Sequence, residues 1–258
     1  MNNTDQLKKK IEEWLLSQGY PLEMRVAALC RDSGFNVIQG HYYSDPETGT
    51  AREIDVIASH PDYTGCIDVS FVIECKVSKK NPWLLFSSQY ALEGFNRLFA
   101  YCINSQSARK VLVEKDIETF LSLPWMKKDG RTAYGITQAF TSGDDQTFKA
   151  ATSVLKAAIA RKLSLDSQRW KPFLFIFPVI IMDGPLFECF LNKDGQLSIE
   201  PFEDGFFFFP WNVLGEAGTC IRILSLNSLT RFITEAKTVG DSLTSLLKKD
   251  IEEKLRTI

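Results

Sequence analysis

One apolar stretch limits the folds that this chain can adopt. Residues 172–182 read Pro-Phe-Leu-Phe-Ile-Phe-Pro-Val-Ile-Ile-Met, without a single charged side chain. The run is too short to cross a bilayer, which takes about 20 residues. Its length is typical of a strand that is buried on both faces. Such a strand fits a sheet flanked by helices, which indicates the α/β class.

The remaining segments supply the helices and the other strands. Helical spacing of apolar residues predicts helices over residues 5–17, 21–33 and 146–163 and from residue 227 on, with Gly240 kinking or splitting the last. Residues 83–104 are predicted to be helical or partly helical. Aromatic and β-branched runs bounded by turn signals predict strands over residues 35–43, 51–59, 67–78, 172–182, 186–191, 197–200 and 220–224. Short turns between the first three strands favour an antiparallel meander.

The order of these elements predicts a single α/β domain, with a mixed central sheet between helices. Its core spans about residues 20–182, with an insertion near residues 105–144. Residues 183–258 then supply C-terminal strands and helices.

Composition excludes several classes of protein. With 45% hydrophobic and 24% charged residues, the chain is neither collagen-like, coiled-coil nor disordered. It has no apolar run long enough for a membrane span and no secretory signal, so we expect a cytoplasmic protein without a membrane partner. The six cysteines form no CxxC pair and are predicted to be buried free thiols. Two histidines are too few to favour a His-rich zinc site.

Charge is spread unevenly along the chain. The net charge is −2, but residues 81–171 carry +5, whereas residues 1–80 carry −3 and residues 172–258 carry −4. The middle segment is therefore either a surface for nucleic acid or a solvated basic face. The candidate phosphate contacts in it are Arg97, Arg109, Lys110, Lys127, Lys128 and Arg131.

Two neighbouring predicted strands carry the residues that indicate chemistry. Asp55 lies inside the strand 51–59, and Glu74 and Lys76 end the apolar strand 67–78. Side chains alternate along a strand, so Glu74 and Lys76 point to the same face. Two carboxylates with a backbone carbonyl form a hard oxygen site suited to Mg²⁺. The metal would activate water for phosphodiester hydrolysis, and Lys76 would orient or help deprotonate that water and stabilise the developing charge.

This pattern resembles the PD-(D/E)xK nuclease superfamily, whose signature is an Asp on one strand and (D/E)-x-K on the next. The matching residues are Asp55 in Arg-Glu-Ile-Asp-Val-Ile-Ala and Glu74-Cys75-Lys76 in Val-Ile-Glu-Cys-Lys. Glu23 matches the glutamate that many members carry on their first helix. Ile54 stands where the Pro of the motif would be, a departure that many members share. The family's α-β-β-β-α-β core agrees with the element order predicted above.

The resemblance implies a restriction-endonuclease-like core with a C-terminal helical elaboration. It implies a nuclease that uses Mg²⁺, or Mn²⁺ in its place, and cleaves DNA in preference to RNA; it is also compatible with a homodimer. Asp55, Glu74 and the Cys75 carbonyl would hold the metal, and Lys76 would act on the attacking water. Glu23 would support a second metal or its water.

Other interpretations of these residues remain open. Glu74 and Lys76 could form a surface salt bridge, and Glu53 could pair with a nearby base. The chain could be a catalytically silent nucleic-acid-binding or assembly module that keeps the fold, or a metal-dependent phosphoesterase for a small molecule. Gln89 resembles a glutamine that some family members use near the metal. The aromatic run 205–211 is predicted to be core or an interface.

Overall fold

The computed structural model describes residues 3–93, 97–115, 123, 125, 130–141, 145–210 and 218–256. The helices are α1 (Asn3–Ser17), α2 (Tyr20–Asp32), α3 (Arg97–Ala100), α4 (Gln106–Glu114), α6 (Gln146–Asp166), α7 (Leu229–Leu246) and α8 (Lys248–Leu255). The strands are β1 (Asn36–Ser44), β2 (Ala51–Ser59), β3 (Ile67–Val77), β4 (Trp83–Ser88), β5 (Ile103–Asn104), β6 (Thr132–Gln138), β7 (Phe173–Asp183), β8 (Leu186–Leu191), β9 (Leu197–Pro201), β10 (Asp204–Phe209) and β11 (Thr219–Ser225).

These strands form one mixed sheet, in the order β1-β2-β3-β7-β11-β10-β6-β4-β8-β9, with β5 paired to β7. The predicted antiparallel meander is confirmed, because β1 pairs with β2 and β2 with β3 in antiparallel register. β7 pairs in parallel with β3 over the full length of both strands, and β11 extends the parallel part. The C-terminal strands β10 and β11 lie inside the sheet, between β7 and β6.

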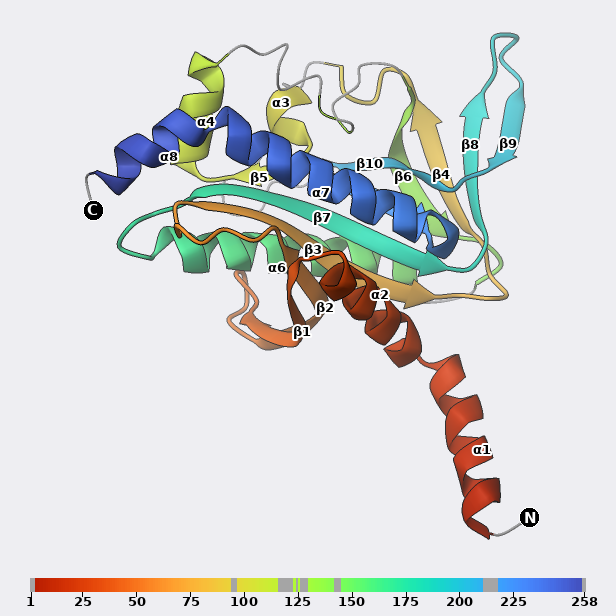
Figure 1. Ribbon diagram of the computed structural model, residues 1–258. Helices are drawn as coiled ribbons and strands as arrows, with labels where there is room; N and C mark the ends of the chain where they lie inside the picture. Colours follow the sequence, from red (N-terminus) through yellow and green to blue (C-terminus); the bar gives the residue numbers. More distant parts are fainter. Residues whose placement is uncertain are drawn as a thin grey trace.

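Helices cover both faces of the sheet, which confirms the α/β class (Figure 1). α6 packs on one face, while α2, α4 and α7 pack on the other. Alternate side chains of β7 enter the two cores: Phe175 and Phe177 face α7, whereas Leu174 and Ile176 face α6. All four are buried, so the apolar run is a strand covered on both faces as predicted.

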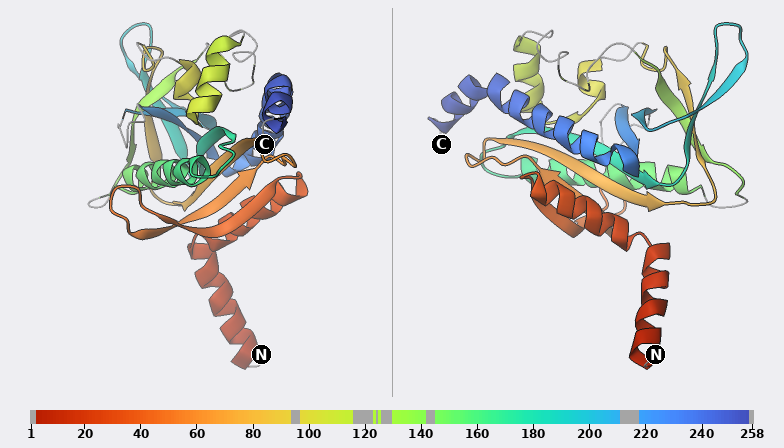
Figure 2. Two further views of the ribbon diagram at one scale, coloured as in Figure 1. Left: turned by 90° about the vertical axis from the view of Figure 1, so that its left-hand side faces the viewer. Right: turned by 45° about the vertical axis from the view of Figure 1, so that its right-hand side comes forward.

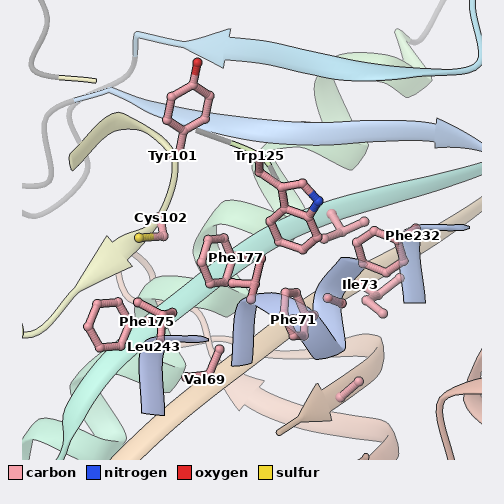
Figure 3. Packing of buried hydrophobic residues seen from close by; sticks show 14 of the residues in the cluster. Val69, Phe71, Ile73, Tyr101, Cys102, Trp125, Phe175, Phe177, Phe232 and Leu243 are labelled. Atoms are coloured by element: carbon pink, nitrogen blue, oxygen red, sulfur yellow. The ribbon is translucent and has the colours of Figure 1, made fainter. Parts of the chain in front are cut away.

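An aromatic cluster fixes α7 against the two central strands (Figure 3). Phe71 of β3 stacks on Phe177 of β7 at 5.3 Å between ring centroids, and Phe232 of α7 meets Phe71 edge-on at 5.9 Å. Trp125 stacks on Phe232 at 5.6 Å, and the guanidinium of Arg222 lies 4.4 Å from the Trp125 ring. Burial of these rings supplies several kcal/mol of apolar transfer free energy, about 1.5–3 kcal/mol per side chain. This packing holds β3, which carries Glu74 and Lys76, in a rigid frame.

Two segments differ from the prediction. Residues 83–88 form strand β4 instead of the start of a helix, and their side chains alternate between buried and half-buried positions. β4 pairs with β6 and with β8, which are distant from it in sequence. This pairing determines the strand conformation of residues 83–88, in spite of the helical spacing of their apolar side chains. Residues 132–138 were predicted to lie in a peripheral insertion, but they form β6 inside the sheet. Residues 116–122 and 126–129 lie outside the described residues.

Three smaller expectations can be compared with the structure. Gly240 does not split the C-terminal helix, because α7 runs through it. A Cβ at this position would lie 2.3 Å from the His60 ring, so the glycine makes room for that ring. All six cysteines are free and buried, as predicted. In the part of the aromatic run that the structure describes, Phe207, Phe208 and Phe209 are buried core residues.

Among the helices that the structure describes, none combines the length and the apolar character that crossing a bilayer requires.

Candidate functional site

The acidic residues of the motif meet where α2 begins beside the β1–β2–β3 meander. Glu23 lies in the first turn of α2, next to Leu22 and ahead of Val26, both of which are buried against the sheet. Pro21 is well suited to this first turn, because it has no N–H to lose there. Glu23 itself is half-buried, and its charge interacts with that of Asp55.

Asp55 and Glu74 lie next to each other on adjacent strands. The β2–β3 pairing ends at Val56 and Ile73, and Asp55 and Glu74 are the next residues on their strands. There, Asp55 Oδ2 accepts a hydrogen bond from the backbone N–H of Cys75 at 2.7 Å. The N–H and C=O of one strand residue point to the same side. We therefore expect the Cys75 carbonyl to face β2 and Asp55 as well.

A glycine on β1 lies opposite Asp55. The β1–β2 pairing omits Gly40 and Asp55 but keeps the same register on both sides of them. Gly40 has a φ of +62°, a conformation that favours glycine. A Cβ added to it would lie 3.1 Å from Glu53 Oε1, so the glycine leaves room for the Glu53 side chain.

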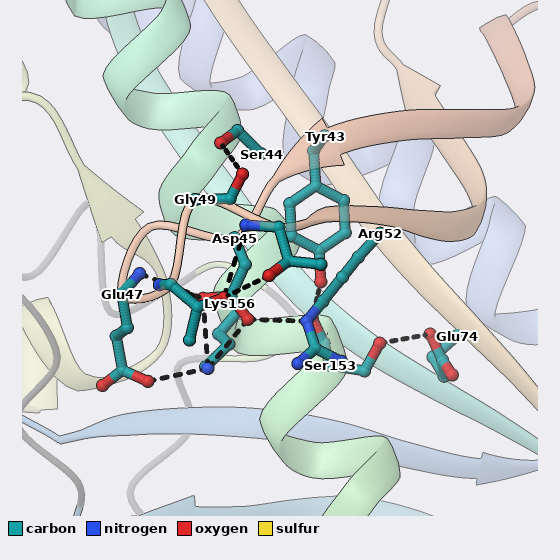
Figure 4. Close-up of polar contacts among 11 residues, drawn as sticks. Tyr43, Ser44, Asp45, Glu47, Gly49, Arg52, Glu74, Ser153 and Lys156 are labelled. Carbon is teal, nitrogen blue, oxygen red and sulfur yellow. Dashed lines mark hydrogen bonds and ion pairs between the residues drawn. The ribbon is translucent and has the colours of Figure 1, made fainter.

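The Glu74 carboxylate is held from two sides. Its Oε1 accepts a hydrogen bond from Lys76 Nζ at 2.5 Å. Its Oε2 accepts one from the Ser153 hydroxyl of α6 at 3.2 Å (Figure 4). Tyr43 of β1 donates to the Ser153 carbonyl at 3.3 Å. Sequence patterns did not indicate Ser153 or Tyr43, because Ser153 is a single polar residue beside an apolar helical stripe and lies 79 positions from Glu74.

Burial and crowding of like charges disfavour ionised carboxylates here. Burial, then the charges of Asp55 and Glu53, raise the pKa of Glu23 to about 7. Burial also raises the pKa values of Asp55 and Glu74, although Lys76 acts in the opposite direction on both. Burial alone would lower the pKa of Lys76, but Glu74 and Asp55 outweigh it and the pKa ends above its ordinary value.

The cluster has more acids than bases. The charges of Glu53, Asp55 and Glu74 act on Glu23, and the charge of Lys76 acts on Glu23, Asp55 and Glu74 in the opposite direction. The set of Asp55, Glu74 and the Cys75 carbonyl offers hard oxygen donors, which suit Mg²⁺ and Mn²⁺. Among the described side chains, no group of three or more His, Cys, Asp or Glu residues is placed to hold a metal ion. The fit of a metal therefore depends on two carboxylates and a backbone oxygen.

Glu23 gives a pH-dependent prediction for the metal-free protein. Its raised pKa of about 7 means that the folded protein binds this proton more tightly than the unfolded chain. Stability from this group is full below its ordinary pKa and is lost as the pH rises through 7. Glu23→Gln should therefore raise the free energy of unfolding by about 1–2 kcal/mol at pH 8, after discounting for solvent exposure, and change it little at pH 4.5.

Urea unfolding in EDTA at both pH values measures this difference. Glu252→Gln, at an exposed position of α8, is the matched control. Equal changes at pH 4.5 and pH 8 for Glu23→Gln would contradict the assignment.

Gln89, a further sequence candidate, lies elsewhere. It lines a hollow with Arg131 and Arg231. It follows β4, which is separated from β3 by four strands of the sheet.

Those of the predicted basic contacts that the structure describes do not gather around the site. Arg109 and Lys110 of α4 line a cavity of about 880 Å³, and Figures 1 and 2 show α4 far from α2. Arg131 pairs with Glu188 at 2.5 Å and lies over the Phe190 ring. Lys127 and Lys128 fall outside the described residues, and the placement of the Arg97 side chain is likewise not described.

A second charged network lies between the β1–β2 turn and α6, near Ser153 (Figure 4). Asp45 is buried, and its carboxylate accepts hydrogen bonds from Lys156 Nζ at 2.9 Å and from Arg52 Nε at 2.6 Å. Lys156 also pairs with Glu47 at 2.7 Å. The network ties α6, which carries Ser153, to the turn between β1 and β2, which leads into the strand of Asp55.

Compared with known proteins, the chain matches no protein-family model, no curated protein and no solved structure at a significant level.

Proposed function

We propose that this protein is a Mg²⁺-dependent nuclease of the PD-(D/E)xK superfamily that hydrolyses phosphodiester bonds, in DNA rather than RNA. The observation that carries the proposal is the grouping of Asp55, Glu74 and Lys76 at one end of the β2–β3 pair, with Glu23 of α2 within electrostatic reach. Buried carboxylates held together are unfavourable unless a cation or a proton compensates them. Such a site has a physical reason to bind a metal.

The order of the elements supports the same proposal. A helix (α2), three antiparallel strands (β1–β3), a second helix (α6) and a parallel strand (β7) follow one another, with β4, β5 and β6 and short helices between β3 and α6. This is the α-β-β-β-α-β order of the restriction-endonuclease-like core, extended by an insertion that contributes strands to the same sheet.

Each residue of the candidate site would have its own role in hydrolysis. Asp55, Glu74 and the Cys75 carbonyl would hold the ion, and Ser153 would keep the Glu74 carboxylate in place. A Mg²⁺ ion at this site supplies the Lewis acidity that polarises a phosphoryl oxygen and lowers the pKa of water. Because Lys76 is charged at neutral pH, its ammonium would position the water and stabilise negative charge, rather than act as a base at rest. Glu23, whose carboxylate lies within electrostatic reach of Asp55 and Glu74, would support a second metal or a metal-bound water.

One observation favours the alternative, a catalytically silent module. The chain carries a net charge of −2, and Arg109, Lys110 and Arg131, the indicated basic side chains that the structure describes, do not gather at the site. Nucleic-acid-binding surfaces are normally basic. A silent module would have no need for the acidic cluster, which makes the nuclease the better-supported proposal.

Cleavage of DNA tests the proposal directly. We expect the protein to cut supercoiled or linear DNA with Mg²⁺ or Mn²⁺ and to be inactive in EDTA. Asp55→Asn should abolish cleavage, whereas Asp194→Asn, in the exposed β8–β9 turn, should not. No cleavage of supercoiled, linear or single-stranded DNA in either metal, or cleavage that survives Asp55→Asn, would overturn the proposal.

A further inference from the structure

Phe140 is an exposed aromatic residue with an unfavourable backbone conformation. It lies in the turn between β6 and α6, and 88% of its surface is accessible. Its φ is +59°, in the left-handed region that residues with a Cβ enter only at a cost in energy. A glycine would suit this backbone, and a polar side chain would suit the solvent around it. Strain of this kind is typical of functional positions, which indicates that the ring serves a contact outside the fold.

The β6–α6 turn is attached to the loop that leaves the candidate site. The backbone N–H of Ala139 donates a hydrogen bond to the Pro82 carbonyl at 2.9 Å, and Gln138 Nε2 donates one to Ser78 Oγ at 2.8 Å. Ser78 follows Lys76 by two residues, in the loop that joins β3 to β4. The turn therefore lies beside the end of β3 that carries Lys76 (Figure 1).

Two lysines on the β3–β4 loop supply positive charge next to this turn. Lys79 and Lys80 are both exposed. Lys79 pairs with Asp183 of β7, yet 61% of its side chain stays accessible. On the turn itself, the Asp145 carboxylate accepts hydrogen bonds from the hydroxyl and the N–H of Thr147, which caps α6. Ammonium groups beside an exposed ring suit a nucleic-acid strand, because the cations meet phosphates and the ring stacks on a base.

We infer that Phe140 stacks on an unpaired base of the DNA strand that the candidate site cleaves, while Lys79 and Lys80 contact phosphates of the same strand. Stacking requires a free face of the base, and inside a duplex both faces are covered by neighbouring bases. The substrate is therefore single-stranded where it meets the turn. This inference rests on the proposed nuclease function and adds the form of DNA that the site accepts.

Binding of single-stranded DNA to the full chain tests the inference in EDTA, where no cleavage occurs. Fluorescence anisotropy with a labelled oligothymidylate should show that Phe140→Ala lowers the affinity by about 5- to 100-fold, the usual contribution of one stacked base. Phe140→Tyr keeps an aromatic ring and should bind as the wild type does. Tyr63→Ala is the matched control, because Tyr63 is 98% exposed in the β2–β3 loop, at the opposite end of β3 from Lys76. Its affinity should equal that of the wild type.

Two more variants separate binding from folding. Phe140→Gly removes the strain, so it should raise the melting temperature of the free protein by about 1–3 °C and still weaken binding as Phe140→Ala does. A lower melting temperature would assign the ring to the fold and overturn the inference. Lys80→Gln should reduce the slope of log affinity against log salt by about 0.7, the value for one phosphate of a single strand. Lys193→Gln, in the exposed β8–β9 turn, should leave that slope unchanged.

The outcomes for this inference and for the nuclease proposal can be told apart. A wild type that does not bind single strands, or a Phe140→Ala variant with wild-type affinity, overturns the inference even if the protein cuts DNA. An equal loss of affinity for blunt duplex DNA in Phe140→Ala also overturns it, because the ring would then contact paired bases. A protein that binds single strands through Phe140 but cuts no DNA would support the base contact and overturn the nuclease proposal.

Discussion

Replacing Lys76 with methionine is expected to lower the rate of DNA cleavage by about 10²–10⁴-fold, the usual contribution of a positioned proton-transfer or charge-stabilising group. Methionine keeps much of the length of the side chain and removes only its charge and hydrogen bonds. Lys76 Nζ lies 2.5 Å from Glu74 Oε1, and the side chain is 30% exposed, so the ammonium can reach a reacting group from the Glu74 side. Its raised pKa keeps it charged at neutral pH.

The same variant separates chemistry from metal binding. Lys76→Met leaves Asp55 and Glu74 in place, so Mg²⁺ should still raise the melting temperature, at least as much as in the wild type. Lys248→Met, at an exposed position of α8, is the control for a general loss of positive charge. Wild-type turnover by Lys76→Met would remove Lys76 from the site, and loss of the Mg²⁺-dependent shift would indicate that the lysine acts on the carboxylates instead.

Local patterns were sufficient for the elements that carry the motif. The first helix of the core, the three-stranded meander and the apolar strand lie close to their predicted bounds, since each has its own turn signals and periodicity. The sequence patterns did not predict strands β4 and β6. β4 pairs antiparallel with β6 and parallel with β8, and β6 also pairs with β10. Their strand conformation depends on partners that no local window contains.

The candidate site likewise contains residues that the sequence indicates and residues that it does not. Asp55 lies on β2, and Glu74 and Lys76 lie on the adjacent strand β3 of the same meander. The alternation of side chains along a strand predicts from the sequence alone that Glu74 and Lys76 share a face. Ser153 reaches Glu74 from α6, and its position follows from packing of that helix on the sheet. The Asp45–Lys156 pair joins residues 111 positions apart. A lysine among the alanines of α6 was the one available sign that a buried partner exists.

Asp45→Ala is expected to cost about 3–5 kcal/mol of unfolding free energy, because it leaves a buried lysine without its main partner. The Asp45 side chain is fully buried and Lys156 is only 8% exposed. Besides Lys156 and Arg52, the carboxylate accepts hydrogen bonds from the backbone N–H groups of Glu47 and Thr48, at 3.0 and 3.3 Å. Urea unfolding at pH 7 measures the loss, and Glu47→Gln, which removes a half-exposed partner of Lys156, should cost much less.

A double-mutant cycle shows whether the unpaired charge is the cause. Asp45→Ala combined with Lys156→Met removes both members of the pair, so the double variant should be more stable than the sum of the single effects predicts. Additive losses would mean that the two residues stabilise the fold independently.

The effect of Asp45→Ala should also depend on pH. Burial acts to raise the pKa of Asp45, but hydrogen bonds from Lys156, Glu47 and Arg52 outweigh it and hold the pKa well below its ordinary value of 3.8. The carboxylate is therefore protonated less readily in the folded protein than in the unfolded chain. Its contribution is present above pH 3.8 and is lost as the pH falls further toward the folded value. The stability difference between wild type and Asp45→Ala should stay constant from pH 7 to about pH 5 and narrow below about pH 4. A difference that widens on acidification would mean that Asp45 does not stabilise the fold as a carboxylate.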